Sequence, residues 1–308
     1  MLSVKKDFIS LADAGTEEIN YILNTAETMK LVLNQKNKKA PHLQGKAVIM
    51  LFFEKSSRTR LSFQLAAQYL SAGIVDMTGE YFDGTFLKDM GNIIDQMGGD
   101  YIIIRHPMSG SAKLLADNVT ASVINAGDGM NENPSQALLD LLTIKTMKGG
   151  FKGLKVAVIG DVLHSRVTHS NIWALPKLGA CVTLAGPPTL VPDEFAGFGV
   201  RIMYDVTEAI NGADVIMVLR VPAEKDYGNL LPSMNEYKNF FGVDEKIIKY
   251  AKPDVIVMHP GPVNRGFEIS SGVADSNRCH VDDQITNGVA VRMALLYLLS
   301  LRKGEEPA

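Results

Sequence analysis

The sequence has few cysteines, no long apolar run and no strongly basic block, and each absence excludes a class of protein. Its two cysteines, Cys181 and Cys279, are far apart and fit neither a disulfide framework nor a zinc site. No apolar run reaches the roughly 18 residues of a transmembrane helix, and the N-terminus lacks the apolar run of a signal peptide. A net charge of −3 without a basic block argues against a nucleic-acid partner. We therefore expect a cytoplasmic protein with no membrane and no nucleic-acid partner.

Two nucleotide-binding motifs are also missing. Gly160 and Asp161 follow an apolar run, but the glycine spacing G-x-G-x-x-G of a dinucleotide site is absent. The lysine motif of P-loop proteins is absent too. What is present is a chain of 308 residues, 46% of them hydrophobic, which is enough for one large or two medium-sized domains with real cores.

Short apolar segments alternate with amphipathic segments along the chain, which is typical of parallel sheets covered by helices. Strands are predicted at residues 47–53, 74–77, 101–105, 122–125, 155–159, 181–185, 200–204, 215–219 and 255–258. Helices are predicted at residues 17–33 with Thr16 as N-cap, from 57 to about 72, and at 86–97, 112–118, 134–148, 165–178, 207–211, 233–241, 244–250 and 284–301.

A glycine-rich break at residues 149–153 separates the two halves of this pattern. The fold class is therefore α/β, with two domains that are each a parallel sheet flanked by helices and that are joined by interdomain helices. We predict that one domain comprises residues 1–135 plus 288–308 and the other residues 150–287.

A cluster of hydrogen-bond donors follows the first predicted strand. A helix N-terminus has unpaired backbone N–H groups and about half a positive charge. The hydroxyls of Ser56, Ser57 and Thr59 and the guanidinium of Arg58 add donors there, so phosphate is the natural ligand. The alternative is a helix merely capped by Ser56 or Ser57, with its arginines on the surface, and the spacing alone favours neither.

The run S-x-R-T-R after F-x-E, residues 52–60, resembles the carbamoyl phosphate signature of the aspartate/ornithine carbamoyltransferase family. Further motifs of this family follow in the same order along the chain. They resemble those of the aspartate branch most. The resemblance implies transfer of the carbamoyl group from carbamoyl phosphate to the amine of an amino-acid acceptor, without a cofactor or metal. It also implies a homotrimer with shared active sites, which regulatory or partner chains can join.

The first domain carries the residues that the resemblance assigns to carbamoyl phosphate. Arg105, at the end of a strand, matches the arginine that holds this substrate, and His106 matches a histidine that supports the loop. Gln136 matches the glutamine that hydrogen-bonds the carbamoyl amide. Asn133 stands where the family has a histidine that polarises the carbamoyl carbonyl. Its amide can donate a hydrogen bond but cannot be protonated, so we expect weaker catalysis, unless Asn133 is only an N-cap.

The second domain carries the residues that the resemblance assigns to the acceptor. Arg166 matches the arginine that takes the α-carboxylate, and Arg220 the arginine that reads the side-chain carboxylate of aspartate. In the turn after strand 255–258, the backbone of Pro260 and Gly261 matches carbonyls that face the carbamoyl nitrogen and the amine. We predict that the peptide bond between Gly261 and Pro262 is cis.

Two histidines near Arg166 have no assigned chemical role. His164 lies outside the core motif and is expected at the surface, whereas His169 is expected to pack and hydrogen-bond locally.

The sequence departs from the family pattern at two further places. Pro222 replaces a glutamine and Lys225 an arginine of the acceptor motif. The loop at residues 78–85 lacks the family's serine and lysine and carries Glu80 and Asp83, while Lys88 is expected on the surface of the next helix. Each carboxylate close to a phosphate would cost about 1–4 kcal/mol. Either the acceptor is cationic and pairs with Glu80 or Asp83, or the loop points away from the site, or the enzyme is impaired.

Three hypotheses follow. Two acceptor arginines suit a dicarboxylate, so the first is a carbamoyltransferase for aspartate, which would serve pyrimidine biosynthesis. The second is a carbamoyltransferase for another amine. The third is a catalytically impaired paralogue that acts as a binding or scaffold subunit.

Overall fold

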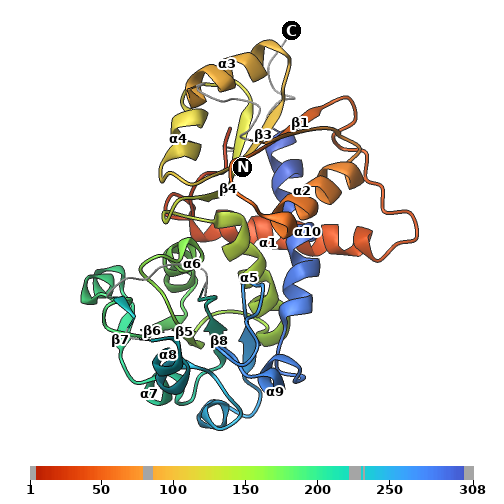
Figure 1. Ribbon diagram of the computed structural model, residues 1–308. Coiled ribbons are helices and arrows are strands. Elements are labelled where there is room, and N and C mark those ends of the chain that lie inside the picture. Colours follow the sequence, from red (N-terminus) through yellow and green to blue (C-terminus); the bar gives the residue numbers. More distant parts are fainter. Residues whose placement is uncertain (1–4, 79–85, 222–229, 232, 302–308) are drawn as a thin grey trace. The chain divides into compact units, whose positions relative to one another are not determined.

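The computed structural model describes residues 5–78, 86–221, 230–231 and 233–301. The chain forms two compact units (Figure 1), Met1–Leu142 with Thr286–Ala308, and Thr143–Ile285. The boundary between the units falls inside helix α5 (Pro134–Lys148) and again inside helix α10 (Val281–Ser300), so continuous helices join the two units. The predicted α/β class with interdomain helices is confirmed.

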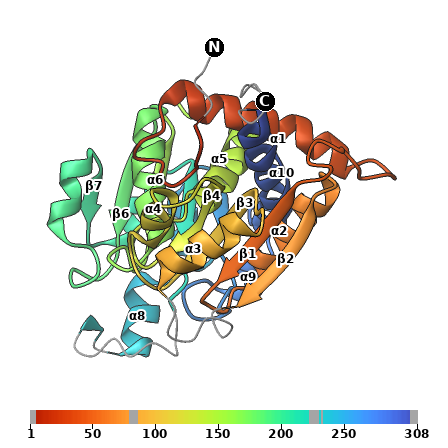
Figure 2. The same ribbon diagram turned by 90° about the horizontal axis from the view of Figure 1, so that it is seen from above.

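The first unit contains a four-stranded sheet in the order β2-β1-β3-β4, and every neighbouring pair is parallel. Its strands are β1 (Ala47–Phe52), β2 (Gly73–Thr78), β3 (Tyr101–His106) and β4 (Ser122–Asp128). Its other helices are α1 (Thr16–Leu33), α2 (Ser57–Tyr69), α3 (Leu87–Gln96) and α4 (Ser111–Ala116). Figure 2 shows α3 and α4 on one face of this sheet, with α1, α2 and α10 on the other.

Alternation of side chains along the strands determines what each face buries. Ile49, Leu51, Ile102 and Ile104 point to one face and form a core cluster with Ile94 of α3 and with apolar residues of α4. The intervening residues point to the opposite face and are equally buried. Both faces are covered, which explains why these strands read as continuous apolar runs in the sequence.

The second unit contains a five-stranded parallel sheet in the order β7-β6-β5-β8-β9. Its strands are β5 (Lys155–Ile159), β6 (Cys181–Ala185), β7 (Arg201–Met203), β8 (Val215–Val218) and β9 (Ile256–Met258). Its α-helices are α6 (Arg166–Lys177), α7 (Val206–Ile210), α8 (Met234–Phe241) and α9 (Ser271–Ala274), and the 3₁₀ helices are η2 (Asp193–Phe198) and η4 (Ile247–Tyr250). Residues of α7, η4 and α9 share one core cluster with β5, β8 and the segments around β9.

Several predicted element ends are wrong. Gly15, not Thr16, is the N-cap of α1. The predicted helix at residues 244–250 is only the 3₁₀ helix η4, and the Asp244 carboxylate accepts from the N–H groups of Lys246 and Ile247 at its start. Strand β4 continues three residues beyond its predicted end, and α10 begins three residues earlier than predicted.

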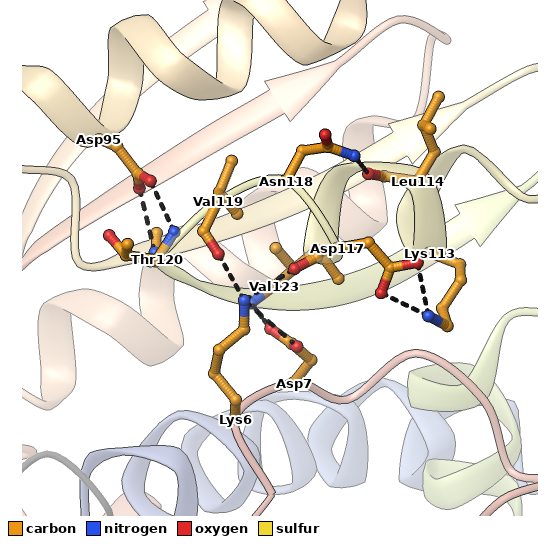
Figure 3. Close-up of polar contacts among 12 residues, drawn as sticks. Lys6, Asp7, Asp95, Lys113, Leu114, Asp117, Asn118, Val119, Thr120 and Val123 are labelled. Carbon is orange, nitrogen blue, oxygen red and sulfur yellow. Dashed lines mark hydrogen bonds and ion pairs between the residues drawn. The ribbon is translucent and has the colours of Figure 1, made fainter.

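The N-terminal segment is tied to the first unit beside β4 (Figure 3). Phe8 forms a parallel bridge with Ile124, and the Asp7 carboxylate accepts a 2.8 Å hydrogen bond from the Val123 N–H group. The Lys6 ammonium donates to the carbonyl of Ala116, the last residue of α4, and to that of Val119 in the segment after it. The last carbonyls of a helix lack partners within the helix. These contacts cover the edge of the sheet that β4 would otherwise expose.

Candidate active site

The sheet of the first unit has a switch point between β1 and β3. The chain leaves β1 toward β2 on one side and leaves β3 toward β4 on the other, and ligands of such sheets bind at the carboxyl ends of the two diverging strands. Phe52 lies directly opposite Arg105, and the Phe53 N–H donates to the Arg105 carbonyl at 2.9 Å. The polar run after β1 and the arginine at the end of β3 therefore share this edge.

The start of α2 offers hydrogen-bond donors that the helix itself does not use. Ser56 occupies the N-cap position, yet its hydroxyl makes no capping hydrogen bond, whereas the N-cap serines of α6 and α8 do. Within the described part of the chain, the hydroxyls of Ser56, Ser57 and Thr59 make no hydrogen bond. Ser56 is thus the N-cap residue, as the alternative expected, but its hydroxyl does not make the capping hydrogen bond. Unused hydroxyl and backbone donors at a helix N-terminus suit an anion.

The two arginines of this run differ. Arg58 is exposed at the first turn of α2. Arg60 instead pairs with Asp76 of β2, with its Nε 2.8 Å and its Nη2 2.6 Å from the two carboxylate oxygens. Such a two-point pair fixes α2 against the sheet. Arg60 therefore has a structural role, whereas Arg58 lies exposed at the helix start.

Arg105 is half-buried and held from two sides. Its Nε lies 3.0 Å from Oε2 of Glu54, and its Nη1 donates to the Ala126 carbonyl at 3.1 Å. Glu54 belongs to the F-x-E motif, but the sequence assigned it no role. The pair orients the planar guanidinium, a group whose geometry matches that of an oxyanion.

His106 supports the loop after β3, as expected. Its Nδ1 accepts a 3.0 Å hydrogen bond from the Met108 N–H, and its ring packs edge-on against Phe53 at 4.5 Å between centroids. Burial lowers the pKa of His106, and the nearby Glu54 and Asp128 carboxylates offset only part of that shift. The neutral form is the one that can accept the Met108 hydrogen bond.

Asn133 and Gln136 lie together at the start of α5. The Asn133 side-chain oxygen accepts from the Gln136 N–H at 3.3 Å, so its predicted role as N-cap is confirmed. The cap uses the side-chain oxygen, and the amide NH₂ is the donor group of this side chain. The Gln136 Nε2 donates to Oδ1 of the buried Asp140 at 3.1 Å, which orients the amide.

Arg292 of α10 is a charged residue of the first unit that the sequence did not single out. It is only 4% exposed, and burial, with repulsion from Arg105 partly offset by Asp140, lowers its pKa to about 9. It therefore stays charged at neutral pH. In the sequence, only its position inside a long, largely apolar segment indicated that Arg292 is buried.

The sheet of the second unit repeats this arrangement. Its switch point lies between β5 and β8, where Ile159 is opposite Val218. Arg166 begins α6 after β5, and Arg220 follows β8; both are half-buried. The structure thus brings both predicted acceptor arginines to the ligand-binding edge of one sheet.

His164 is partly buried, with 21% of its side chain exposed, so the expected surface position holds only in part. Its Nδ1 lies 2.9 Å from both oxygens of the buried Asp161 carboxylate, and its backbone N–H donates to the same carboxylate. The two residues stiffen the loop that leads into α6 and Arg166. The ring of His169 stacks on Phe195 at 5.4 Å, so its predicted local packing is confirmed.

The turn after β9 contains the predicted cis peptide bond between Gly261 and Pro262. His259 Nδ1 accepts the Gly261 N–H at 2.8 Å, so the imidazole proton is on Nε2, which lies 3.0 Å from Oε1 of Glu268. The same oxygen accepts the Asn264 N–H at 2.7 Å. Glu268, fully buried and overlooked in the sequence, thereby holds the turn that contains Pro260.

Some features singled out in the sequence lie outside the described residues, namely Glu80, Asp83, Pro222 and Lys225. Lys88 is exposed on α3, as expected. In the part of the chain that the structure covers, no three His, Cys, Asp or Glu side chains gather as metal ligands would. The helices described there include none that is long and apolar enough to cross a membrane.

Two parallel sheets, each with arginines at its switch point, define a class of α/β protein that binds anionic ligands at the carboxyl ends of its strands. The family models narrow this class. The carbamoyl-P binding domain of aspartate/ornithine carbamoyltransferase matches residues 6–146, and the Asp/Orn binding domain of the same enzymes matches residues 152–299. The chain belongs to the aspartate/ornithine carbamoyltransferase family, a family of transferases.

Relatives match over nearly the full length. The aspartate carbamoyltransferase catalytic subunit of Acetivibrio thermocellus is 57% identical over 99% of both chains, and that of Ruminiclostridium cellulolyticum is 57% identical over 96% of both. Aspartate transcarbamoylase from Trypanosoma cruzi, solved with carbamoyl aspartate and phosphate, has a TM-score of 0.86 at 29% identity, covering 96% of this chain and 97% of that one. Ornithine carbamoyltransferase from Pyrococcus furiosus has the same TM-score at 31% identity, covering 97% and 98%.

Proposed function

We propose that this protein transfers the carbamoyl group of carbamoyl phosphate to the amine of aspartate, a step of pyrimidine biosynthesis, and releases phosphate. The observation that carries the proposal is the set of unused donors at the start of α2, which follows the strand end that lies opposite Arg105. The names of the relatives, which are 57% identical over nearly the whole chain, favour aspartate over other acceptors.

The first unit would hold the carbamoyl phosphate. Ser56, Ser57 and Thr59 would donate hydroxyl and backbone hydrogen bonds to the phosphate, and Arg58 and Arg105 would neutralise its charge. Gln136, oriented by Asp140, would bind the carbamoyl amide through its oxygen. The Asn133 amide would donate a hydrogen bond to the carbamoyl oxygen.

The second unit would hold the acceptor. Arg166 would bind the α-carboxylate and Arg220 the side-chain carboxylate, since a guanidinium matches a carboxylate in shape and charge. The carbonyls of Pro260 and Gly261 would accept hydrogen bonds from the amine, in a turn that Glu268 holds through His259.

The reaction would need no nucleophile from the protein. The neutral amine attacks the carbonyl carbon, a C–N bond forms, the C–O bond to phosphate breaks, and the amine proton leaves with the phosphate. Phosphate is a good leaving group, so positioning and stabilisation of the developing oxyanion would supply the rate enhancement. Asn133 would stabilise the oxyanion less than a protonated histidine, because a neutral donor makes the weaker hydrogen bond.

We also propose that the chain works in the cytoplasm as a homotrimer with shared active sites. Light scattering on the purified chain tests the oligomeric state, and a monomer that is fully active would contradict shared sites.

An amine panel tests the proposed function. Purified protein is mixed with carbamoyl phosphate and aspartate, ornithine or other amines, and the ureido product is measured. We expect product with aspartate and none with ornithine. Product with another amine alone would support the second hypothesis, and no product with any amine would support the impaired paralogue.

A ligand-binding variant tests the site. Arg58→Ala is expected to abolish the thermal stabilisation by carbamoyl phosphate, while Arg201→Ala, on the exposed face of β7, should retain it. Stabilisation that survives Arg58→Ala would overturn the assignment at α2.

A further inference from the structure

The second unit holds a cavity of about 570 Å³ that neither Arg166 nor Arg220 lines. The segments after β6 and β7 form one side, and α8 with the residues just before it forms the other. Cavities that bind small molecules commonly measure about 300–1,000 Å³ and combine apolar walls with a few polar groups. This cavity has the volume of such a site, and the reaction proposed above leaves it unused.

Among the lining residues that the structure describes, the charged side chains are both acidic. Asp205 and Glu236 line the cavity, and no lysine, arginine or histidine does so among the lining residues that the structure describes. Within the described residues, the Glu236 carboxylate makes no hydrogen bond or ion pair. Asp205 uses only Oδ1, which accepts from the N–H groups of Thr207 and Glu208 at 2.7 and 3.1 Å. Its second oxygen makes no hydrogen bond to the described part of the chain.

Aromatic rings lie beside these carboxylates. Tyr204 and Phe240 line the cavity and are 42% and 65% exposed, which leaves large apolar surfaces in contact with water. The Tyr204 hydroxyl lies 2.6 Å from Oδ1 of Asp193, which holds the ring in place. Deeper in, the buried Leu231 and Tyr237 continue the apolar wall. Aromatic faces and carboxylates together favour an ammonium group on a flat apolar body.

We propose that this cavity is a binding site for an amphipathic organic monocation, with the ammonium group between Asp205 and Glu236 and the apolar body against Tyr204 and Phe240. The attraction is electrostatic and hydrophobic at once, so neither a neutral nor an anionic molecule of the same shape should bind as well.

The cavity is also connected to the proposed acceptor site, and this part of the inference rests on the proposed function. Leu231 and Tyr237 form a core cluster with Leu190 and Val221, and Val221 directly follows Arg220. A ligand that holds Leu231 and Tyr237 in place would restrict Val221 and hence Arg220. We therefore expect occupancy to change the KM for aspartate more than kcat.

Binding is tested on the full chain with tryptamine as the probe and indole-3-acetate as its anionic counterpart, using calorimetry and saturation-transfer NMR. We expect saturable binding of tryptamine and little of the anion. Glu236→Gln should weaken tryptamine binding about two- to fivefold, the range of a partly exposed charge pair, and Phe240→Ala should weaken it similarly. Glu208→Gln, the same change at a residue that does not line the cavity, should leave it unchanged. Equal binding of both probes, no saturable binding, or an unchanged affinity in Glu236→Gln would overturn the site.

Turnover is measured separately, with and without tryptamine. A shift in the KM for aspartate that Glu236→Gln abolishes supports the connection to Arg220, and binding without any shift overturns that connection. Because the binding measurements do not depend on turnover, a failure of the proposed reaction would leave the test of the cavity intact.

Discussion

Nη1 of Arg292 donates a 2.7 Å hydrogen bond to the hydroxyl of Ser62, in the second turn of the helix whose start carries the proposed phosphate site. The same guanidinium lies over the ring of Phe63, 4.9 Å from its centroid. A buried, charged group is thus fixed against α2 and close enough to Arg105 for the two charges to repel each other. A dianion bound at the site would relieve that repulsion.

The first prediction concerns this charge. Arg292→Met keeps the apolar stem but removes the positive charge, and we expect phosphate to bind about tenfold more weakly, a difference of about 1.4 kcal/mol. Arg292→Lys should recover most of the affinity, and Arg201→Met, at an exposed arginine of the other unit, should have no effect. Calorimetric titration with phosphate measures all three, and an unchanged affinity in folded Arg292→Met would contradict this role.

The second prediction concerns the buried pair of His259 and Glu268. Glu268→Ala leaves two donors, the His259 Nε2–H and the Asn264 N–H, without their acceptor. We expect each of these donors to lower the unfolding free energy by about 1–3 kcal/mol. The KM for aspartate should rise because the turn at Pro260 loosens. Glu268→Gln keeps an acceptor oxygen, so its fall in unfolding free energy and its rise in KM should both be smaller. Urea unfolding and steady-state kinetics measure the two effects, and a stable Glu268→Ala variant with normal KM would refute the prediction.

The third prediction is a pH dependence of stability. Burial lowers the pKa of His106, so the unfolded chain binds a proton more readily than the folded chain. The contribution of His106 to stability is therefore complete above the ordinary histidine pKa of about 6.5 and is lost as the pH falls below it. Urea unfolding between neutral and mildly acidic pH should show this decline, and His106→Gln should flatten it. An identical pH profile in the variant would mean that other groups dominate.

The fourth prediction reverses the departure at Asn133. Asn133→His introduces the family's residue, and we expect kcat to rise about tenfold, at the lower end of what general acid–base groups contribute. The N-cap of α5 is lost with the asparagine, so the unfolding free energy should fall by about 0.5–2 kcal/mol. Asn133→Ala should lose the cap without gaining activity. A kcat that does not rise in a folded Asn133→His variant would indicate that Asn133 already performs the histidine's task.

The strands and the principal helices could be predicted because apolar periodicity is a local property. The strand–turn–helix at residues 47–69 is an example, since its apolar run and polar helix start are continuous in the sequence. The element ends near residues 16, 244 and 281 were missed because the ends of helices fray and apolar periodicity does not mark them.

The sequence by itself determined the α/β pattern, the family and the residues that follow each strand, because order along the chain carries all of this. Only the tertiary structure decided that Phe52 lies opposite Arg105, that Glu54 orients that arginine, and that Arg292 is buried near α2. Strand order, ion pairs between distant residues and burial depend on three-dimensional packing, and residues far apart in the chain leave no local pattern from which they could be read.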